Sequence, residues 1–152
     1  SLTDRQLIDA LKEASQAGVK IKMIIRGICC ILPGIEGKTD NIEVISVVGR
    51  FLEHSRIFCF GTGENMKMYI ASADWMTRNT ENRVEIAAPI YDQKIKNSIY
   101  DTLRIMWKDN LKARILCSDG TYKKPEIKEG DELIDCQNYL RHEYKVGRKI
   151  KL

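Results

Sequence analysis

A histidine set between two arginines marks the stretch GRFLEHSRIFCF, which runs from Gly49 to Phe60. His54 has Arg50 before it and Arg56 after it, and an apolar, strand-like run follows. An imidazole can donate or accept a proton near neutral pH, and a guanidinium binds a phosphate through two parallel hydrogen bonds. The stretch therefore suits phosphoryl chemistry, although a lone histidine can also be a hydrogen-bonded structural residue at a strand edge. His142, near the chain end, has no such neighbours, and we interpret it as a surface residue.

Further groups of the same kind follow along the chain. The sequence ASAD at residues 71–74 ends an apolar run, and Arg83 and Glu85 lie on the next expected strand. Together with His54 and Arg56 they would supply fixed positive charge, backbone donors and an orienting carboxylate, the parts that phosphoryl transfer needs. The structural alternatives stay open. Arg83 and Glu85 can form a same-face surface pair, Arg56 can anchor a strand, and the small residues can serve close packing.

The positive charge of the chain is unevenly placed, although the formal net charge is only +4. Five arginines lie in the middle third of the chain or just before it, at the ends of apolar runs: Arg26, Arg50, Arg56, Arg78 and Arg83. A solvated face would more often use lysine, so this clustering favours a phosphate ligand. Unrelated surface ion pairs are the alternative.

Length and composition indicate one compact domain. A chain of 152 residues with 43% apolar content can bury one sizeable core. The apolar run at residues 21–32 is interrupted by charged residues and glycine, so we expect neither a membrane span nor a signal peptide. Five cysteines without CxxC spacing indicate neither a disulfide framework nor a zinc site, and they favour a reducing cytosol. Because the chain starts at Ser1 and almost at once enters a helix, we expect a piece of a longer protein.

The elements that must position these side chains alternate along the chain. Thr3 and Gln6 have capping-box spacing, which predicts a helix that ends at Gly18, and Asp92 is the expected cap of a second helix that ends near Trp107. A third helix is expected at residues 131–145. Strands are expected at residues 19–25, 42–48, 56–60, 67–73 and 83–90, with a short one at 112–117.

This order predicts an α/β domain with a mixed sheet flanked by helices. Arg26 would follow the first strand, at the carboxyl edge where such sheets usually bind ligands.

Two resemblances carry the interpretation further. The HSR stretch, followed by a strand and ASAD, is similar to the two halves of the phospholipase D motif, with Arg56 in place of its lysine and Asp74 in place of its asparagine. A closer resemblance is to the C-terminal catalytic domain of bacterial polyphosphate kinase, which itself has a phospholipase D-like fold. It rests on IIRGICCILPGIEGKTDNIEVISVVGRFLEHSRIFCF and MYIASADWMTRNTENRVEIAAPI, which cover residues 24–90 apart from a short turn. The tail after Lys112 resembles the family only loosely.

The resemblance to polyphosphate kinase implies roles for individual residues. Arg26 matches an arginine that contacts the nucleotide phosphates, and His54 matches the second essential histidine of the family, which assists transfer by acid/base catalysis or by binding phosphate. Arg83 and Glu85 fall on active-site positions, and Arg56 and Arg83 would line the path of the polyanion. The histidine that becomes phosphorylated belongs to a preceding domain, together with the arginines assigned to magnesium and a tyrosine assigned to the nucleotide.

The resemblance therefore implies reversible transfer of the ATP terminal phosphate to polyphosphate by a longer cytoplasmic enzyme, free or peripheral to the membrane. ATP, ADP, magnesium and polyphosphate would be its ligands, with the magnesium ligands mainly outside this chain and no metal site within it. The remaining domains of the same chain and further copies in a homo-oligomer would be its partners. The isolated chain is expected to be inactive.

Two other classes of function remain open. A phospholipase D-like phosphodiesterase or nuclease would use His54 as its nucleophile, but the sequence lacks the full HxKxxxxD pattern. A non-catalytic module could bind polyphosphate or nucleic acid. An aromatic content of 7% argues against a stacking platform for single-stranded nucleic acid.

Overall fold

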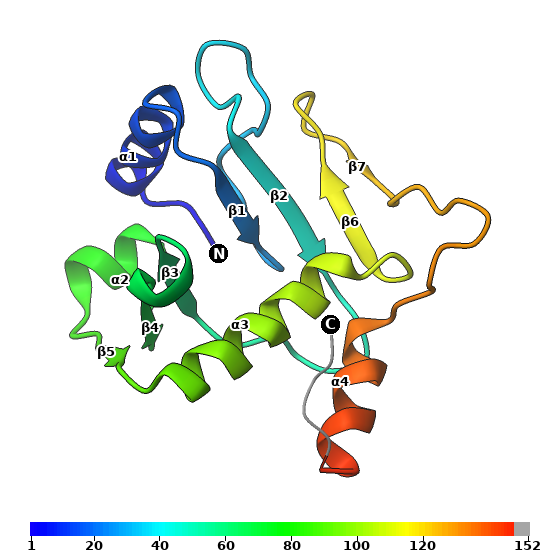
Figure 1. Cartoon of the computed structure of the whole chain (residues 1–152). Coiled ribbons are helices and arrows are strands. Elements are labelled where there is room, and N and C mark those ends of the chain that lie inside the picture. Colours follow the sequence, from blue (N-terminus) through cyan, green and yellow to red (C-terminus); the bar gives the residue numbers. More distant parts are fainter. Residues whose placement is uncertain (148–152) are drawn as a thin grey trace.

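The computed structural model describes residues 1–147 and has helices on both sides of β-structure (Figure 1). The elements in chain order are α1 Arg5–Gln16, β1 Ile21–Ile24, β2 Ile42–Val47, β3 Ile57–Phe60, the 3-10 helix η1 Gly63–Asn65, β4 Lys67–Ala71, α2 Thr77–Asn82, β5 Ala87–Ile90, α3 Gln93–Lys108, β6 Ala113–Leu116, β7 Tyr122–Lys123 and α4 Cys136–Lys145. The predicted α/β class is confirmed.

The strands divide into two sheets. The first has the order β1-β2-β6-β7, and it is mixed because β1 runs parallel to β2 while the other neighbours are antiparallel. The second has the order β3-β4-β5 and is antiparallel throughout. The expected mixed sheet is therefore present, but three of the expected strands form a separate sheet (Figure 1). Most of the predicted site residues lie in the segments that precede β3 and β5.

The core lies on both faces of the four-stranded sheet, and β2 is its centre. Ile42 and Val44 pack with α1 on one face, whereas Ile45 and Val47 pack with α3 and α4 on the other. This alternation follows from the two-residue repeat of a strand, and both valines are only 1% exposed. Burial on both faces fixes the register of β2.

The helix starts are set by aspartates. Asp4, rather than the expected Thr3, caps α1, because its Oδ1 accepts a hydrogen bond from the backbone N–H of Leu7 at 3.0 Å. Asp92 caps α3 as predicted. The last helix begins at Cys136, later than expected, because Asp135 is its cap.

The last strand of the second sheet is shorter than predicted. Residues 83–86 were expected to be strand, but β5 begins only at Ala87. The helix α2 precedes them and was not predicted. Its six residues, TRNTEN, contain no apolar stripe, so the helical repeat gives no signal there.

The first residues of the chain connect the two sheets. Leu2, only 2% exposed, forms isolated parallel bridges with Cys29 after β1 and with Trp75 after β4. Its N–H donates to the carbonyl of Ile28 at 2.8 Å, and the N–H of Thr3 donates to the carbonyl of Trp75 at 2.8 Å. The segments that follow β1 and β4 therefore lie on either side of the same short stretch of chain.

No helix within residues 1–147 is both long and apolar enough to cross a membrane.

Candidate active site

His54, Arg56 and Asp74 form one hydrogen-bonded network at the start of β3. The guanidinium of Arg56 binds the carboxylate of Asp74 at two points, with Nε 3.2 Å from Oδ1 and Nη2 3.2 Å from Oδ2. The same Nη2 lies 3.2 Å from Nε2 of His54. Arg56 therefore ties the predicted histidine to an aspartate that the sequence places eighteen residues further on.

The contact with Arg56 defines the tautomer of His54. A guanidinium has only donors, so Nε2 of His54 must be the acceptor when this hydrogen bond forms. A neutral imidazole then carries its hydrogen on Nδ1. Because the side chain is exposed, the Nδ1–H group is the donor that His54 can offer to a ligand.

The Arg56 and Asp74 pair is half-buried and stays charged. The hydrogen bond from Arg56 lowers the pKa of Asp74 and outweighs the opposing effect of burial. The same bond raises the pKa of Arg56. The pair therefore holds a fixed positive group beside the imidazole, with its guanidinium plane set by the carboxylate.

Glu85 belongs to a second, neighbouring cluster. Its carboxylate accepts hydrogen bonds from the hydroxyl of Ser72 and from Nδ2 of Asn79, the latter at 2.6 Å. These two bonds, in that order, lower the pKa of Glu85, and the positive charges of Arg83 and Arg56 add to the effect. Glu85 is therefore an ionised acceptor near neutral pH, and it can orient or balance cations but cannot act as a general acid.

Strand pairing brings the two clusters together. The N–H of Ala71 donates to the carbonyl of Arg56 at 2.9 Å, and the N–H of Ser72 donates to the carbonyl of Ile86 at 3.0 Å. The segments that carry Arg56, Ser72 and Glu85 are consequently neighbours across the three-stranded sheet. The same bonds occupy the N–H groups of Ala71 and Ser72, so these two are not free to bind phosphate as the small-residue stretch suggested.

The two remaining predicted residues, Arg26 and Arg83, are exposed cations. Within residues 1–147 neither side chain forms a hydrogen bond or an ion pair. Arg26 follows β1 at its carboxyl end, as predicted, and the N–H of Ile25 continues the pairing to the carbonyl of Ile45 at 2.8 Å. Both guanidinium groups are thus available to an anion.

Sequence reasoning missed two residues that support the site. Asn79, only 4% exposed, holds Glu85 while its own Oδ1 has no partner within the described residues. Gln137 binds the loop that carries His54 from a distance of more than eighty residues along the chain. Neither residue has a local signal, since an amide in a polar helix is unremarkable until its partner is known.

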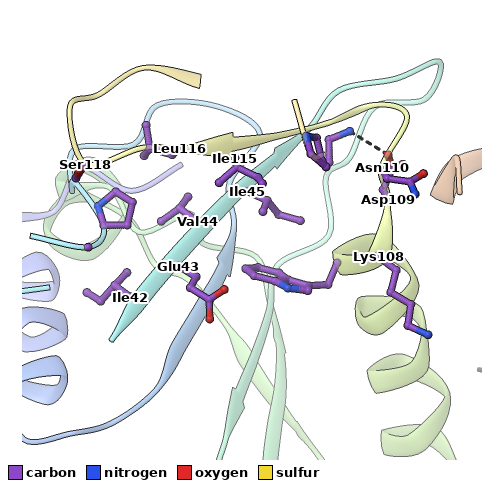
Figure 2. A pocket seen from close by; sticks show the side chains of 15 residues that line it. Ile42, Glu43, Val44, Ile45, Lys108, Asp109, Asn110, Ile115, Leu116 and Ser118 are labelled. Carbon is purple, nitrogen blue, oxygen red and sulfur yellow. Dashed lines mark hydrogen bonds between the residues drawn. The ribbon is translucent and has the colours of Figure 1, made fainter. Parts of the chain in front are cut away.

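A pocket of about 350 Å³ lies elsewhere, on the face of the four-stranded sheet next to the end of α3 (Figure 2). Its lining includes Val44, Ile45 and Ile115 from the strands and Trp107 from the helix. None of the predicted site residues lines it. The predicted site residues lie instead in the exposed and half-buried segments next to β1, β3, β4 and β5.

The fold and the cluster define a class of protein. The chain is a phospholipase D-like α/β domain that presents guanidinium groups and an imidazole at its strand ends.

Comparison with known proteins identifies the family. Residues 1–137 match the family model described as polyphosphate kinase C-terminal domain 2, and the chain belongs to this family. It is 52% identical over 137 residues to the polyphosphate kinase of Bacillus anthracis, covering 90% of this chain and 19% of that protein. It is 47% identical over 148 residues to the polyphosphate kinase of an Exiguobacterium species, covering 97% of this chain and 20% of that protein.

A solved structure agrees. The chain superposes on the crystal structure of polyphosphate kinase from Porphyromonas gingivalis with a TM-score of 0.89 and 38% identity, over 96% of this chain and 22% of the other. The chain therefore spans about a fifth of the length of the relatives it matches.

Proposed function

We propose that this chain is the C-terminal catalytic domain of a polyphosphate kinase, which transfers the terminal phosphate of ATP reversibly to polyphosphate. Residues 1–152 would form one domain of a longer enzyme. In the forward reaction the P–O bond to ADP breaks as a P–N bond forms to a histidine in another domain. That P–N bond then breaks as a terminal oxygen of polyphosphate bonds to phosphorus.

The observation that best supports this proposal is the fixed pair of Arg56 and His54, in a domain that also exposes the guanidinium groups of Arg26 and Arg83. Phosphoryl transfer depends on positioning and on neutralising the oxygens of the moving group. Within residues 1–147 the side chains of Arg26 and Arg83 form no hydrogen bond or ion pair, and they can bind phosphate through two parallel hydrogen bonds. With its Nε2 occupied by Arg56, His54 would assist as a hydrogen-bond donor through Nδ1–H rather than as a nucleophile.

Arg56 and Glu85 would have supporting roles. Arg56 would keep the imidazole in one tautomer and add positive charge to the path of the polyanion. Glu85 would act through its negative charge, holding the segment that carries Arg83 in place.

Magnesium is the metal that the family implies, but this segment does not fit a magnesium site. The ion prefers several carboxylate, water and phosphate oxygens. Within the described part of the chain, no group of three or more His, Cys, Asp or Glu side chains could hold a metal ion. Asp74 and Glu85 are already bonded to Arg56, Ser72 and Asn79. The magnesium ligands would then lie in other parts of the enzyme. We further propose that the complete enzyme is a homo-oligomer. It would be located in the cytoplasm, either free or bound peripherally to the membrane.

The test compares the 152-residue chain with the complete enzyme that contains it. We expect the complete enzyme to convert radiolabelled ATP into polyphosphate, and the isolated chain to fold, bind polyphosphate and make no polymer. Binding of polyphosphate, ATP and single-stranded DNA to the chain at two salt concentrations separates the other classes of function. Steady synthesis by the isolated chain would contradict the assignment of the phosphorylated histidine to another domain. Tighter binding of DNA than of polyphosphate would favour a nucleic-acid function.

A further inference from the structure

The loop that carries His54 has almost no backbone structure of its own. It connects β2 to β3 and covers residues 48–56, none of which is in a helix or strand. Two of its apolar side chains point into solvent, since Val48 is 61% and Leu52 is 68% exposed. Arg50 lies over the ring of Phe51, with 5.7 Å between its guanidinium carbon and the ring centroid. Such a loop needs an outside anchor to hold an imidazole in one place.

Gln137 on α4 provides that anchor. Its Oε1 accepts the N–H of Phe51 at 2.8 Å, and its Nε2 donates to the carbonyl of Phe51 at 2.8 Å. The same Nε2 donates to Oε1 of Glu53 at 2.7 Å. One amide thus satisfies both backbone groups of one loop residue and the side chain of another, and the second lies directly before His54.

The amide of Gln137 is itself firmly held. Its side chain is only 7% exposed, and it sits in the first turn of α4. Asp109 accepts the N–H of Cys136 at 2.8 Å and so fixes the start of this helix. On the loop side, a Cβ built on Gly49 would stand 2.5 Å from Oε1 of Gln137, so the backbone and the amide are in close contact there.

We propose that Gln137 is a positioning residue for His54, and that α4 takes part in the reaction by holding the loop at residues 51–53. This inference rests on the proposed function, because it holds that the loop is ordered so that the imidazole of His54 is placed for phosphoryl transfer. His54 is then fixed from two sides, with Gln137 ahead of it in the loop and Arg56 on its ring. Gln137 bonds to the loop and acts on His54 through it, whereas Arg56 also adds charge to the proposed path of the polyanion.

The mechanism predicts a particular kinetic signature. Loss of the amide leaves Arg26 in place, so nucleotide binding changes little, while the imidazole samples positions away from the reacting group. We therefore expect Gln137→Ala in the complete enzyme to lower kcat by about ten- to a hundredfold, as displacement of a catalytic group by about 1 Å can do. The KM for ATP should change by less than about threefold, because ground-state binding is retained.

A second measurement does not depend on kinase activity. Hydrogen exchange of the complete enzyme, followed by mass spectrometry, reports on the loop directly. The N–H of Phe51 should exchange about tenfold faster in Gln137→Ala, since one hydrogen bond protects it. Exchange in β2 should not change, because its ladder is buried on both faces.

Two further variants test the geometry. Gly49→Ala places a methyl group against the amide from the loop side, creates no hole in α4, and should show the same loss of kcat and the same faster exchange. Asn138→Ala is the matched control. It removes the neighbouring amide on the same helix, whose side chain bonds, among residues 1–147, only to Asp135, and should leave both readouts at wild-type values.

Wild-type kcat in both Gln137→Ala and Gly49→Ala would overturn the proposal, as would an equal loss in Asn138→Ala. If Gln137→Ala does not fold, Gly49→Ala decides alone. If the complete wild-type enzyme makes no polyphosphate from ATP, the proposed function is contradicted instead. In that case faster exchange at residues 51–53 would still confirm the loop anchor, and unchanged exchange would reject it.

Discussion

Asp109 and Asp74 are both held as charged carboxylates, but they lie in two regions of the molecule with different partners. Asp109, 2% exposed, ends α3 beneath the four-stranded sheet. Its Oδ1 accepts the N–H groups of residues 111–113 and its Oδ2 that of Cys136. Asp74, with 24% of its side chain exposed, binds the guanidinium of Arg56 beside the three-stranded sheet.

The different partners of Asp109 and Asp74 indicate a structural role for Asp109 and a role in the candidate site for Asp74. Burial opposes the charge of Asp109, yet the backbone N–H groups outweigh it and lower its pKa, so this carboxylate is committed to holding α4 and β6. The pKa of Asp74 is lowered chiefly by a side chain that solvent can reach. A partner of that kind can be redirected to a ligand, whereas a set of backbone groups cannot. We therefore expect substitution of Asp109 to change chiefly stability and substitution of Asp74 to change chiefly activity.

The largest effect should come from His54. We expect His54→Ala in the complete enzyme to lower kcat about a hundred- to ten-thousandfold, the range of a lost acid/base or hydrogen-bonding group. The free energy of unfolding of this domain should change by less than about 0.5 kcal/mol, because the side chain is exposed. Activity per folded molecule and thermal unfolding are the two measurements. If the domain unfolds while the specific activity is kept, His54 is structural and the comparison fails.

Asp109→Asn should produce the opposite pattern. The new amide keeps one acceptor oxygen, but its NH₂ group faces the N–H of Cys136, which is left buried without a partner. We expect the free energy of unfolding to fall by about 2–4 kcal/mol, the sum of a weakened charge-assisted set and one unsatisfied donor. Urea unfolding of the 152-residue chain measures it. The kcat of the enzyme that remains folded should fall far less than in His54→Ala, because Asp109 acts on the site only through the start of α4. A loss of kcat as large as that of His54→Ala would place Asp109 with the site.

Arg26→Lys tests the other end of the site. Lysine keeps the charge but loses the planar fork, so a two-point grip on phosphate becomes a single contact. We expect kcat/KM for ATP to fall about ten- to a hundredfold, equivalent to roughly 1.5–3 kcal/mol. Stability should be unchanged, since Arg26 has no partner within residues 1–147. Unchanged kinetics with a lower Tm would remove Arg26 from the site.

The fold could be predicted from the sequence wherever a local signal sufficed. The strand Ile42–Val47 and the helix after Asp92 have strong periodicity and a cap, and both were found. The separation into two sheets could not be predicted, because a strand's own sequence does not identify its neighbours. The helix Thr77–Asn82 was missed because tertiary contacts, such as Thr80 with Asp4 at 2.6 Å, stabilise it without an apolar face.

In the candidate site too, residues with a local sequence signal were predicted and those that depend on tertiary contacts were not. His54, Arg56 and Arg83 were proposed from residue type and from resemblance to the family, and their roles stay predictions. The carboxylate was assigned less well, because Asp74 rather than Glu85 binds the guanidinium that faces His54. Gln137 was not found at all, since its bonds span more than eighty residues of sequence. Partners of this kind depend on the tertiary fold, which no local pattern encodes.

Acid should weaken the structural region in a defined direction. The folded-state pKa of Asp109 is lowered relative to the unfolded chain, so the folded state binds fewer protons. Its contribution to stability is present above the unfolded value of about 4 and is lost as the pH falls through the folded value. We expect urea unfolding at pH 6 and at pH 3 to show this loss. It should be smaller in Asp109→Asn, and an equal loss would assign the acid sensitivity to other carboxylates.

Asp74→Asn should have the smallest effect on stability, and it tests the comparison most directly. The substitution keeps one oxygen for Nε of Arg56 and turns an NH₂ group toward its Nη2, so one of the two bonds is lost. Because water can solvate the freed guanidinium, we expect the free energy of unfolding to fall by less than about 1 kcal/mol. Because Nη2 of Arg56 loses its carboxylate oxygen, this atom is no longer fixed beside Nε2 of His54, so nitrogen NMR of the imidazole should show a mixture of tautomers. Urea unfolding of Asp74→Asn and Asp109→Asn, measured in parallel, compares the loss in free energy of unfolding in the two variants. A loss of stability as large as that of Asp109→Asn, with the tautomer unchanged, would mean that the two carboxylates do the same work and that Asp74 is structural.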